Sequence, residues 1–155
     1  MKSEMQNINI VSVSERDNSP LLSELRKILE KKWGEFAPFE ANKQGLQAPI
    51  SLVAIDGEQV VGGLVFSIYQ IPNESSDGIW INGLIVKDEY RRRGIASSLI
   101  ERAVISASND NITELHVNTD IPTLYLKLGW QLIGKNDSDS VLRISIGNSI
   151  SKKHE

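Results

Sequence analysis

The chain has 155 residues, of which 40% are hydrophobic and 24% charged, a balance typical of one globular domain with a real core. Its net charge of -3 argues against broad nucleic-acid binding, which needs a basic face, and its lack of cysteine excludes disulfides, thiolate metal sites and cysteine nucleophiles. The first residues lack the apolar core of a signal peptide and no apolar run could cross a bilayer, so we expect a cytoplasmic protein with no membrane partner.

The N-terminal third predicts one strand and one helix. Apolar and polar residues alternate over residues 8–14, as in a half-buried strand. Ser19 and Pro20 then supply an N-cap and a first turn, apolar residues follow at helical spacing, and Gly34 ends the helix. Residues 35–48 show no clear period and are expected to be irregular or weakly helical.

Three more strands are predicted in the middle of the chain. Residues 50–56 and 59–71 lie on either side of an Asp-Gly turn, which is a strong hairpin signal. The turn-rich segment 72–78 leads to residues 79–87, whose apolar residues are nearly continuous toward Val86. Both faces of this fourth strand are therefore expected to be covered.

Helices and strands alternate in the next part of the chain. An apolar stripe at three- and four-residue spacing predicts a helix from Ile95 to Ala107, and residues 112–118 predict a fifth strand. Asp120 is expected to cap a short helix over residues 121–128, which ends at a glycine.

Two closing strands complete the predicted order β-α-(α)-β-β-β-α-β-α-β-β. They cover residues 130–134 and 140–146, and residues 147–155 are expected to form a flexible tail. The sequence contains no internal repeat and no linker. We therefore predict a single mixed α/β domain over residues 1–155, with helices on the faces of one sheet.

Three consecutive arginines, Arg91, Arg92 and Arg93, stand directly before Gly94 and the start of the predicted helix. A helix N-terminus already carries partial positive charge, so the run is unfavourable unless an anion binds there. A strand, a glycine turn and a helix start present backbone N–H groups to an anion, and arginine adds forked donors that match phosphate oxygens. These features favour a pyrophosphate site. A solvated basic turn is the simpler alternative.

Two segments resemble the GNAT-type N-acetyltransferases. Residues 84–103 (LIVKDEYRRRGIASSLIERA) are similar to the acetyl-CoA-binding segment, whose pattern R/Q-x-x-G-x-G/A reads here Arg91-x-x-Gly94-x-Ala96. Residues 117–130 (VNTDIPTLYLKLGW) are similar to the second signature, a helix that carries a tyrosine and ends at Gly-Phe or Gly-Trp. The resemblance implies an acyl-CoA N-acyltransferase-like fold. This is a mixed, mostly antiparallel sheet of six to seven strands, flanked by helices on both faces, with splayed fourth and fifth strands.

The resemblance also implies how acetyl-CoA is bound, without a metal. The turn before the helix would bind the pyrophosphate, mainly through backbone N–H groups. The preceding strand would splay at a bulge, pair with the pantetheine arm and polarise the thioester carbonyl. The residues assigned to the co-substrate are Leu84, Ile85, Val86, Arg91, Arg92, Arg93, Gly94, Ile95, Ala96, Ser97 and Asn118. Asn118 also suits ordinary turn chemistry at a strand end.

Tyr125 is the predicted catalytic residue. In the family, the tyrosine at this point of the second signature lies beside the sulfur and supplies or shares the proton for the leaving thiolate. The alternative explanation is an amphipathic core residue whose hydroxyl reaches water.

The general base is not identified by the sequence. Family members often use a glutamate on the fourth strand, and this strand has none. A chain of waters, or an acid from a loop, with Glu35, Glu40 and Asp77 as candidates, could take the proton. Asp120 is expected to act as a helix cap and His116 as a structural or exposed residue.

The acceptor is expected to be a small-molecule primary amine, which would enter over residues 33–47 and 72–78. Aromatic and acidic side chains in these segments suit a cation, although they equally suit a solvated surface. A non-catalytic module of the same fold that senses CoA or acyl-CoA is the alternative function. The apolar closing strands could serve as the interface of a homodimer.

Overall fold

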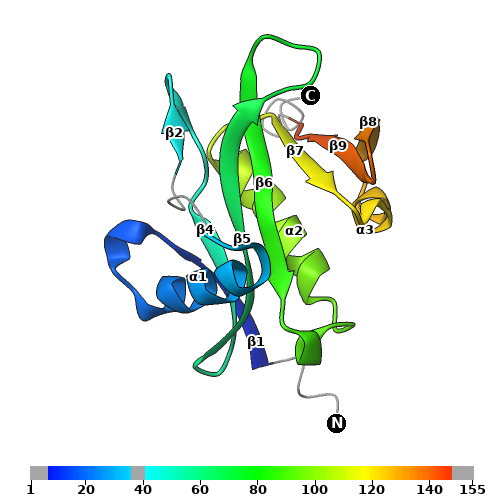
Figure 1. The fold of residues 1–155 in the computed structure, drawn as a ribbon. Helices are drawn as coiled ribbons and strands as arrows, with labels where there is room; N and C mark the ends of the chain where they lie inside the picture. Colours follow the sequence, from blue (N-terminus) through cyan, green and yellow to red (C-terminus); the bar gives the residue numbers. More distant parts are fainter. Residues whose placement is uncertain (1–6, 36–40, 148–155) are drawn as a thin grey trace, which may run out of the picture.

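The alternating strand segments form a single seven-stranded sheet in the order β1-β4-β5-β6-β7-β9-β8 (Figure 1). The structure is a computed structural model that describes residues 7–35 and 41–147. The strands of the sheet are β1 (Ile8–Val13), β4 (Ser51–Asp56), β5 (Gln59–Gln70), β6 (Asp77–Val86), β7 (Glu114–Thr119), β8 (Gln131–Asn136) and β9 (Asp139–Ser145).

Every neighbouring pair in this sheet is antiparallel except β6 and β7. These two parallel strands pair Trp80 with His116 and Ile81 with Val117, and then diverge. We call the point where they diverge the fork. The expectation of a mostly antiparallel sheet with splayed fourth and fifth strands is therefore confirmed.

A bulge lies next to the fork. Val65 of β5 faces Gly83, but the next residue, Phe66, faces Ile81, so Asn82 is an extra residue on β6. A bulge bends a strand and increases its local twist. It therefore turns β6 away from β7 at the point where their pairing stops.

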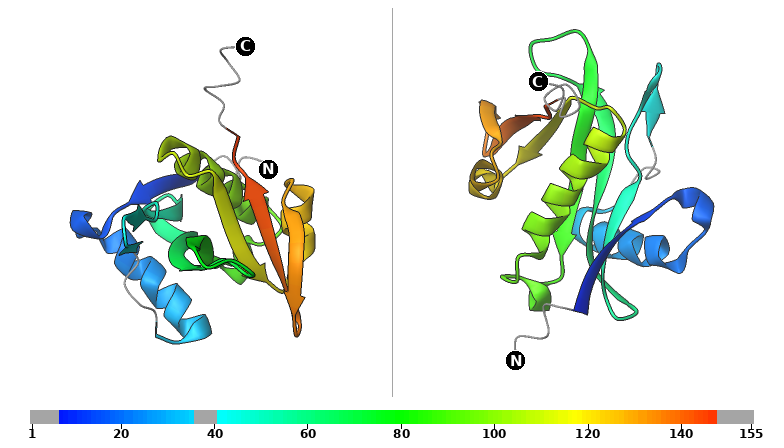
Figure 2. Two further views of the ribbon diagram at one scale, coloured as in Figure 1. Left: turned by 90° about the horizontal axis from the view of Figure 1, so that it is seen from above. Right: turned by 180° about the vertical axis from the view of Figure 1, so that it is seen from behind.

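Helices cover both faces of the sheet (Figure 2). The helix α1 (Pro20–Trp33) buries Leu22, Leu25 and Leu29 on one face, where they form a cluster with residues of β1, β4, β5 and β6. The helix α2 (Ile95–Asn109) buries its apolar stripe on the other face. A short helix, α3 (Pro122–Lys127), packs against β8 and β9. Each fully buried leucine contributes about 1.5–3 kcal/mol, so both helices are fixed mainly by these clusters.

The capping prediction for α1 is confirmed. The side chain of Ser19 accepts a hydrogen bond from the N–H of Leu21, and Gly34 follows the last turn with a φ of 88°. Two 3-10 turns that the sequence did not suggest lie at Glu15–Asp17 and Asp88–Tyr90. Within the described parts of the chain, no helix is long and apolar enough to cross a membrane.

The segment expected to be irregular or weakly helical contains a small hairpin instead. Strands β2 (Asn42–Lys43) and β3 (Leu46–Gln47) pair through a turn in which Gln44 and Gly45 both have positive φ. Two positive φ values give the tight hairpin turn that matches strand twist. The sequence signal was missed because each strand has only two residues and no period can show. Glu40 and the tail beyond residue 147 lie outside the described residues.

Candidate active site

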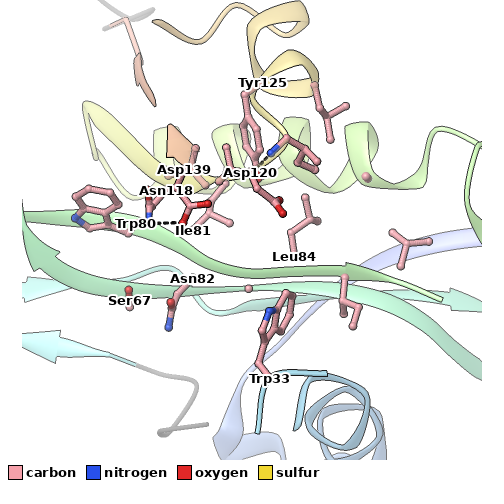
Figure 3. Close-up of a pocket in the computed structure, with 18 of the residues that line it drawn as sticks. Trp33, Ser67, Trp80, Ile81, Asn82, Leu84, Asn118, Asp120, Tyr125 and Asp139 are labelled. Carbon is pink, nitrogen blue, oxygen red and sulfur yellow. Dashed lines mark hydrogen bonds between the residues drawn. The ribbon is translucent and has the colours of Figure 1, made fainter. Parts of the chain in front are cut away.

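The fork opens into a cleft of about 1290 Å³. Its walls come from β6, from the turn before α2 and the first turn of α2, from the end of β7, and from α3. It continues over the ends of α1 and β5 on the α1 face of the sheet, so Trp33 and Tyr125 line it from opposite sides of β6 (Figure 3). The cleft therefore reaches both faces of the sheet beside the fork.

The N-terminus of α2 forms one end of this cleft. Gly94 is the N-cap and has a φ of 80°, and no side chain hydrogen-bonds to the cap. The first N–H groups of a helix have no partner within the helix, so those of Ile95, Ala96 and Ser97 are available to a ligand. A Cβ on Gly94 would meet no atom within 4 Å, which leaves the backbone open to close approach. This is a favourable anion site.

The three arginines have different surroundings. Arg91 forms an ion pair with Asp88 at 3.2 Å and its Nε donates to the carbonyl of Val86. Arg93 donates to the carbonyl of Glu89 and stacks 4.7 Å from the centre of the Tyr90 ring. Arg92 lines the cleft and pairs with no acid among the described residues. The partners of Arg91 and Arg93 within the protein therefore offset part of the charge repulsion. Of the three arginines, Arg92 is the one available to a ligand.

Tyr90 anchors the turn and was not identified from the sequence. Its hydroxyl donates at 2.6 Å to Asp56, which lies at the end of β4 in the β4–β5 hairpin. The hydrogen bond to Asp56 raises the pKa of the Tyr90 hydroxyl, so the pair stays intact at neutral pH. The cation at the ring face of Tyr90 is Arg93, so this tyrosine fixes both the turn and one of its arginines.

The free edge of β6 forms the long wall of the cleft. Beyond Ile81, β6 keeps its pairing with β5 but has no pairing with β7 among the described residues. Ile85 and Val86 bury their side chains on opposite faces of the sheet, as the continuous apolar pattern predicted. An unpaired strand edge of this kind can bind an extended ligand through main-chain hydrogen bonds.

Tyr125 reaches the cleft from α3. The residue is 2% exposed, and its ring lies edge-to-face against Trp130, with 5.1 Å between ring centres. Burial raises the pKa of the Tyr125 hydroxyl, so it remains protonated at neutral pH. The geometry therefore provides a proton donor held in a fixed orientation.

The sequence-predicted residues are brought together with one exception. Those that line the cleft are Leu84, Ile85, Val86, Arg91, Arg92, Gly94, Ile95, Ala96, Ser97, Asn118 and Tyr125. Arg93 does not line it. Asn118, exposed at the end of β7, donates to Asp139 at 3.3 Å. Asp139 and Ser67 also line the cleft but carried no signal, because each stands in an ordinary strand or turn pattern.

The prediction that Asp120 caps α3 is wrong. The N-cap is Ile121 and it has no side-chain cap. The hydroxyl of Thr119 accepts the N–H of Ile121 at 3.0 Å, so the turn is closed by a threonine instead. The side chain of Asp120 lines the cleft.

The acids proposed as bases lie elsewhere. Asp77 forms an ion pair with Lys43 at 3.0 Å, and neither Asp77 nor Glu35 lines the cleft. Among the described residues, no group of three or more histidine or acidic side chains is arranged to hold a metal ion.

His116 is fully buried in β7 beside Trp80, with 5.1 Å between ring centres. Neither ring nitrogen has a hydrogen-bond partner among the described residues. Burial lowers the pKa of His116, Arg143 lowers it further, and Glu114, whose carboxylate is 3.8 Å away, opposes the shift. His116 lies outside the cleft lining, as expected for a structural residue.

We expect His116 to make the protein less stable as the pH falls below about 6.5, which is the ordinary pKa of a histidine side chain. The unfolded state binds the proton more readily than the folded state. The contribution of His116 to folding stability is therefore fully present above this pH, and it is lost as the pH falls toward the lower pKa that His116 has in the folded state. Denaturant unfolding between pH 7.5 and pH 5 would measure the loss. The substitution His116→Leu should flatten the curve over this window, and parallel curves for the two proteins would contradict the assignment.

A family model described as an acetyltransferase (GNAT) domain matches residues 48–132. A search of curated proteins finds no match. Among solved structures, the chain is similar to Arabidopsis thaliana NAA60 in complex with a bisubstrate analogue, with 15% identity and a TM-score of 0.64 over 91% of this chain and 99% of that one.

Two further solved structures share the fold. An aminoglycoside 6'-N-acetyltransferase complexed with coenzyme A has 16% identity and a TM-score of 0.66, over 90% of this chain and 97% of that one. A GNAT family acetyltransferase from Elizabethkingia anophelis with acetyl-CoA bound has 14% identity and a TM-score of 0.59, over 90% and 98%. At these identities the likeness concerns the fold.

Proposed function

The chain belongs to the GNAT acetyltransferase family, and from this membership we propose that it transfers the acetyl group of acetyl-CoA to a primary amine in the cleft at the fork. One observation carries the proposal. The open N-terminus of α2, the unpaired edge of β6 and the side chain of Tyr125 all line the same cleft.

The residues present fit acetyl-CoA. The amides of Ile95, Ala96 and Ser97, with Arg92, would bind the pyrophosphate, because a doubly charged anion balances the helix dipole and the uncompensated arginine. The edge of β6 over residues 82–86 would pair with the amides of the pantetheine arm. Bound acetyl-CoA supplies a thioester whose carbonyl carbon accepts the amine.

Two groups of the protein would assist the chemistry. A backbone N–H next to the bulge at Asn82 would stabilise the charge that develops on the carbonyl oxygen, as a fixed donor in a desolvated site. Tyr125 would give its proton to the leaving sulfur, because its hydroxyl is protonated before the reaction. Both groups act on an amine and a thioester bound at once, so we propose direct transfer in a ternary complex.

We propose a small-molecule amine as the acceptor. It would enter on the α1 face, where Trp33 and Trp80 line the cleft and can bind a cation or an apolar group. The structural neighbours include an aminoglycoside acetyltransferase and the NatC complex bound to a Gag peptide, so the class of acceptor must be measured.

A non-catalytic CoA or acyl-CoA sensor is the second candidate. The observation that favours it is the absence of an acid on β6 beside the fork. Tyr125 and the complete turn of α2 favour the enzyme.

We expect free thiol to be released from acetyl-CoA when the protein is incubated with an accepted amine. The panel consists of spermidine, kanamycin A, tyramine, amino acids and a synthetic peptide with a free N-terminus. The chain has no cysteine, so a thiol reagent reports CoA alone. Thermal stabilisation by acetyl-CoA without turnover on any amine would favour the sensor. Absence of both effects would contradict the proposal.

A further inference from the structure

We propose that Asp120 binds the acceptor's ammonium group and takes a proton from it. This rests on the proposed acetyl transfer and supplies the base that the transfer lacks. Among the described residues, Asp120 and Asp139 are the acids that line the cleft.

The two carboxylates are not equivalent. Asp139 accepts a hydrogen bond from the side-chain amide of Asn118 at 3.3 Å. No described residue donates to the carboxylate of Asp120 or pairs with it. Asp120 therefore has both oxygens available for a ligand, whereas Asp139 holds the end of β7.

The backbone explains why Asp120 is free. Thr119 closes the turn with its own hydroxyl, and Pro122 begins α3 without an N–H that would need a cap. An aspartate before a helix usually caps its N-terminus, but here Asp120 is not needed as a cap. Figure 3 shows Asp120 pointing into the cleft, in the part lined by Tyr125 and Leu84.

The position suits a base. Asp120 directly follows the strand β7, on one side of the fork, and the carbonyl-polarising edge belongs to β6 on the other side. An amine that reaches the thioester through the fork would pass between them. The other ionisable side chains that line this cleft are Asp139, Tyr69, Tyr90, Tyr125, Lys32, Arg91 and Arg92, and none of them is a free carboxylate.

The proton balance is complete with Asp120 and Tyr125. Asp120 takes one proton from the ammonium, which frees the nitrogen lone pair to form the C–N bond while the C–S bond breaks. Tyr125 protonates the sulfur. The second proton that the nitrogen loses returns to Tyr125 through solvent, and Asp120 releases its proton to solvent, so the products are an amide, a thiol and one proton.

The test is the isosteric substitution Asp120→Asn, measured with the amine of the panel that the wild type turns over fastest. We expect kcat/KM for the amine at pH 7 to fall about 10²-fold, while the Kd for acetyl-CoA is unchanged. The deficit should shrink as the pH approaches the pKa of the amine, because free amine then needs no base. Asp137→Asn makes the same change in the exposed β8–β9 turn, outside the cleft lining, and should behave as the wild type.

Three results would overturn the proposal. The first is a pH profile of Asp120→Asn that equals that of the wild type. The second is a loss of kcat/KM in Asp120→Asn that does not depend on pH. The third is a pH-dependent loss of kcat/KM in Asp139→Asn and none in Asp120→Asn. Failure of the proposed function would look different, because the wild type itself would then release no thiol.

Discussion

Replacing Tyr125 by phenylalanine is expected to lower kcat by about 10²–10⁴-fold without changing the Kd for acetyl-CoA. The ring is buried against Trp130, so phenylalanine keeps the packing and removes only the hydroxyl. The loss follows because the thiolate would leave without a proton. Steady-state kinetics with the best amine of the panel, together with calorimetric binding of acetyl-CoA, measures both quantities.

Tyr69→Phe makes the same atomic change at a tyrosine that is 69% exposed on the α1 side of the cleft. It should leave kcat within a small factor of the wild type. If Tyr125→Phe turned over every amine as fast as the wild type, Tyr125 would have no part in the proton transfer and would be a packing residue only.

The substitution Gly94→Val is expected to weaken acetyl-CoA binding by about 10-fold or more, while the protein still folds. Gly94 has a φ of 80°, which costs a non-glycine residue about 1–2 kcal/mol and a β-branched residue more. The turn would relax to negative φ and redirect the amides of Ile95 and Ala96. About 1.4 kcal/mol of lost interaction corresponds to a tenfold change in Kd.

Gly45→Val is the matched control. Gly45 has a φ of 88° and, like Gly94, has no atom within 4 Å of the position that a Cβ would take, but it lies in the β2–β3 hairpin outside the cleft. Both variants should lose stability by similar amounts in denaturant unfolding. Only Gly94→Val should lose affinity, and equal affinity in the two variants would exclude the α2 turn as the anion site.

Much of the fold could be predicted from the sequence because its periodic signals are local. The stripe of α2, the Asp-Gly hairpin and the near-continuous apolar run of β6 each follow from neighbouring residues. The β2–β3 hairpin could not, since two-residue strands contain no period. The bulge at Asn82 could be placed only by resemblance, because it is defined by the register of β5, a tertiary property.

The site was predictable where a motif stands close together in the chain. Gly94 and Tyr125 belong to such segments. Asp139 and Tyr90 do not, since their partners Asn118 and Asp56 are 21 and 34 residues away. Asp120 was misassigned because an aspartate before a proline helix start resembles a cap, and the competing hydroxyl of Thr119 becomes visible only in three dimensions.

The fork also governs the mechanics of the molecule. The two halves of the sheet meet through only two residue pairs between β6 and β7 in the described chain, and α2, which touches β4, β5, β6 and β7, spans the joint. Few main-chain bonds resist a change of angle between the halves, so the separation of Tyr125 from the β6 edge depends on the packing of α2. Substitutions on the buried side of that helix, far from any reacting atom, would therefore change the distance between the Tyr125 hydroxyl and the thioester.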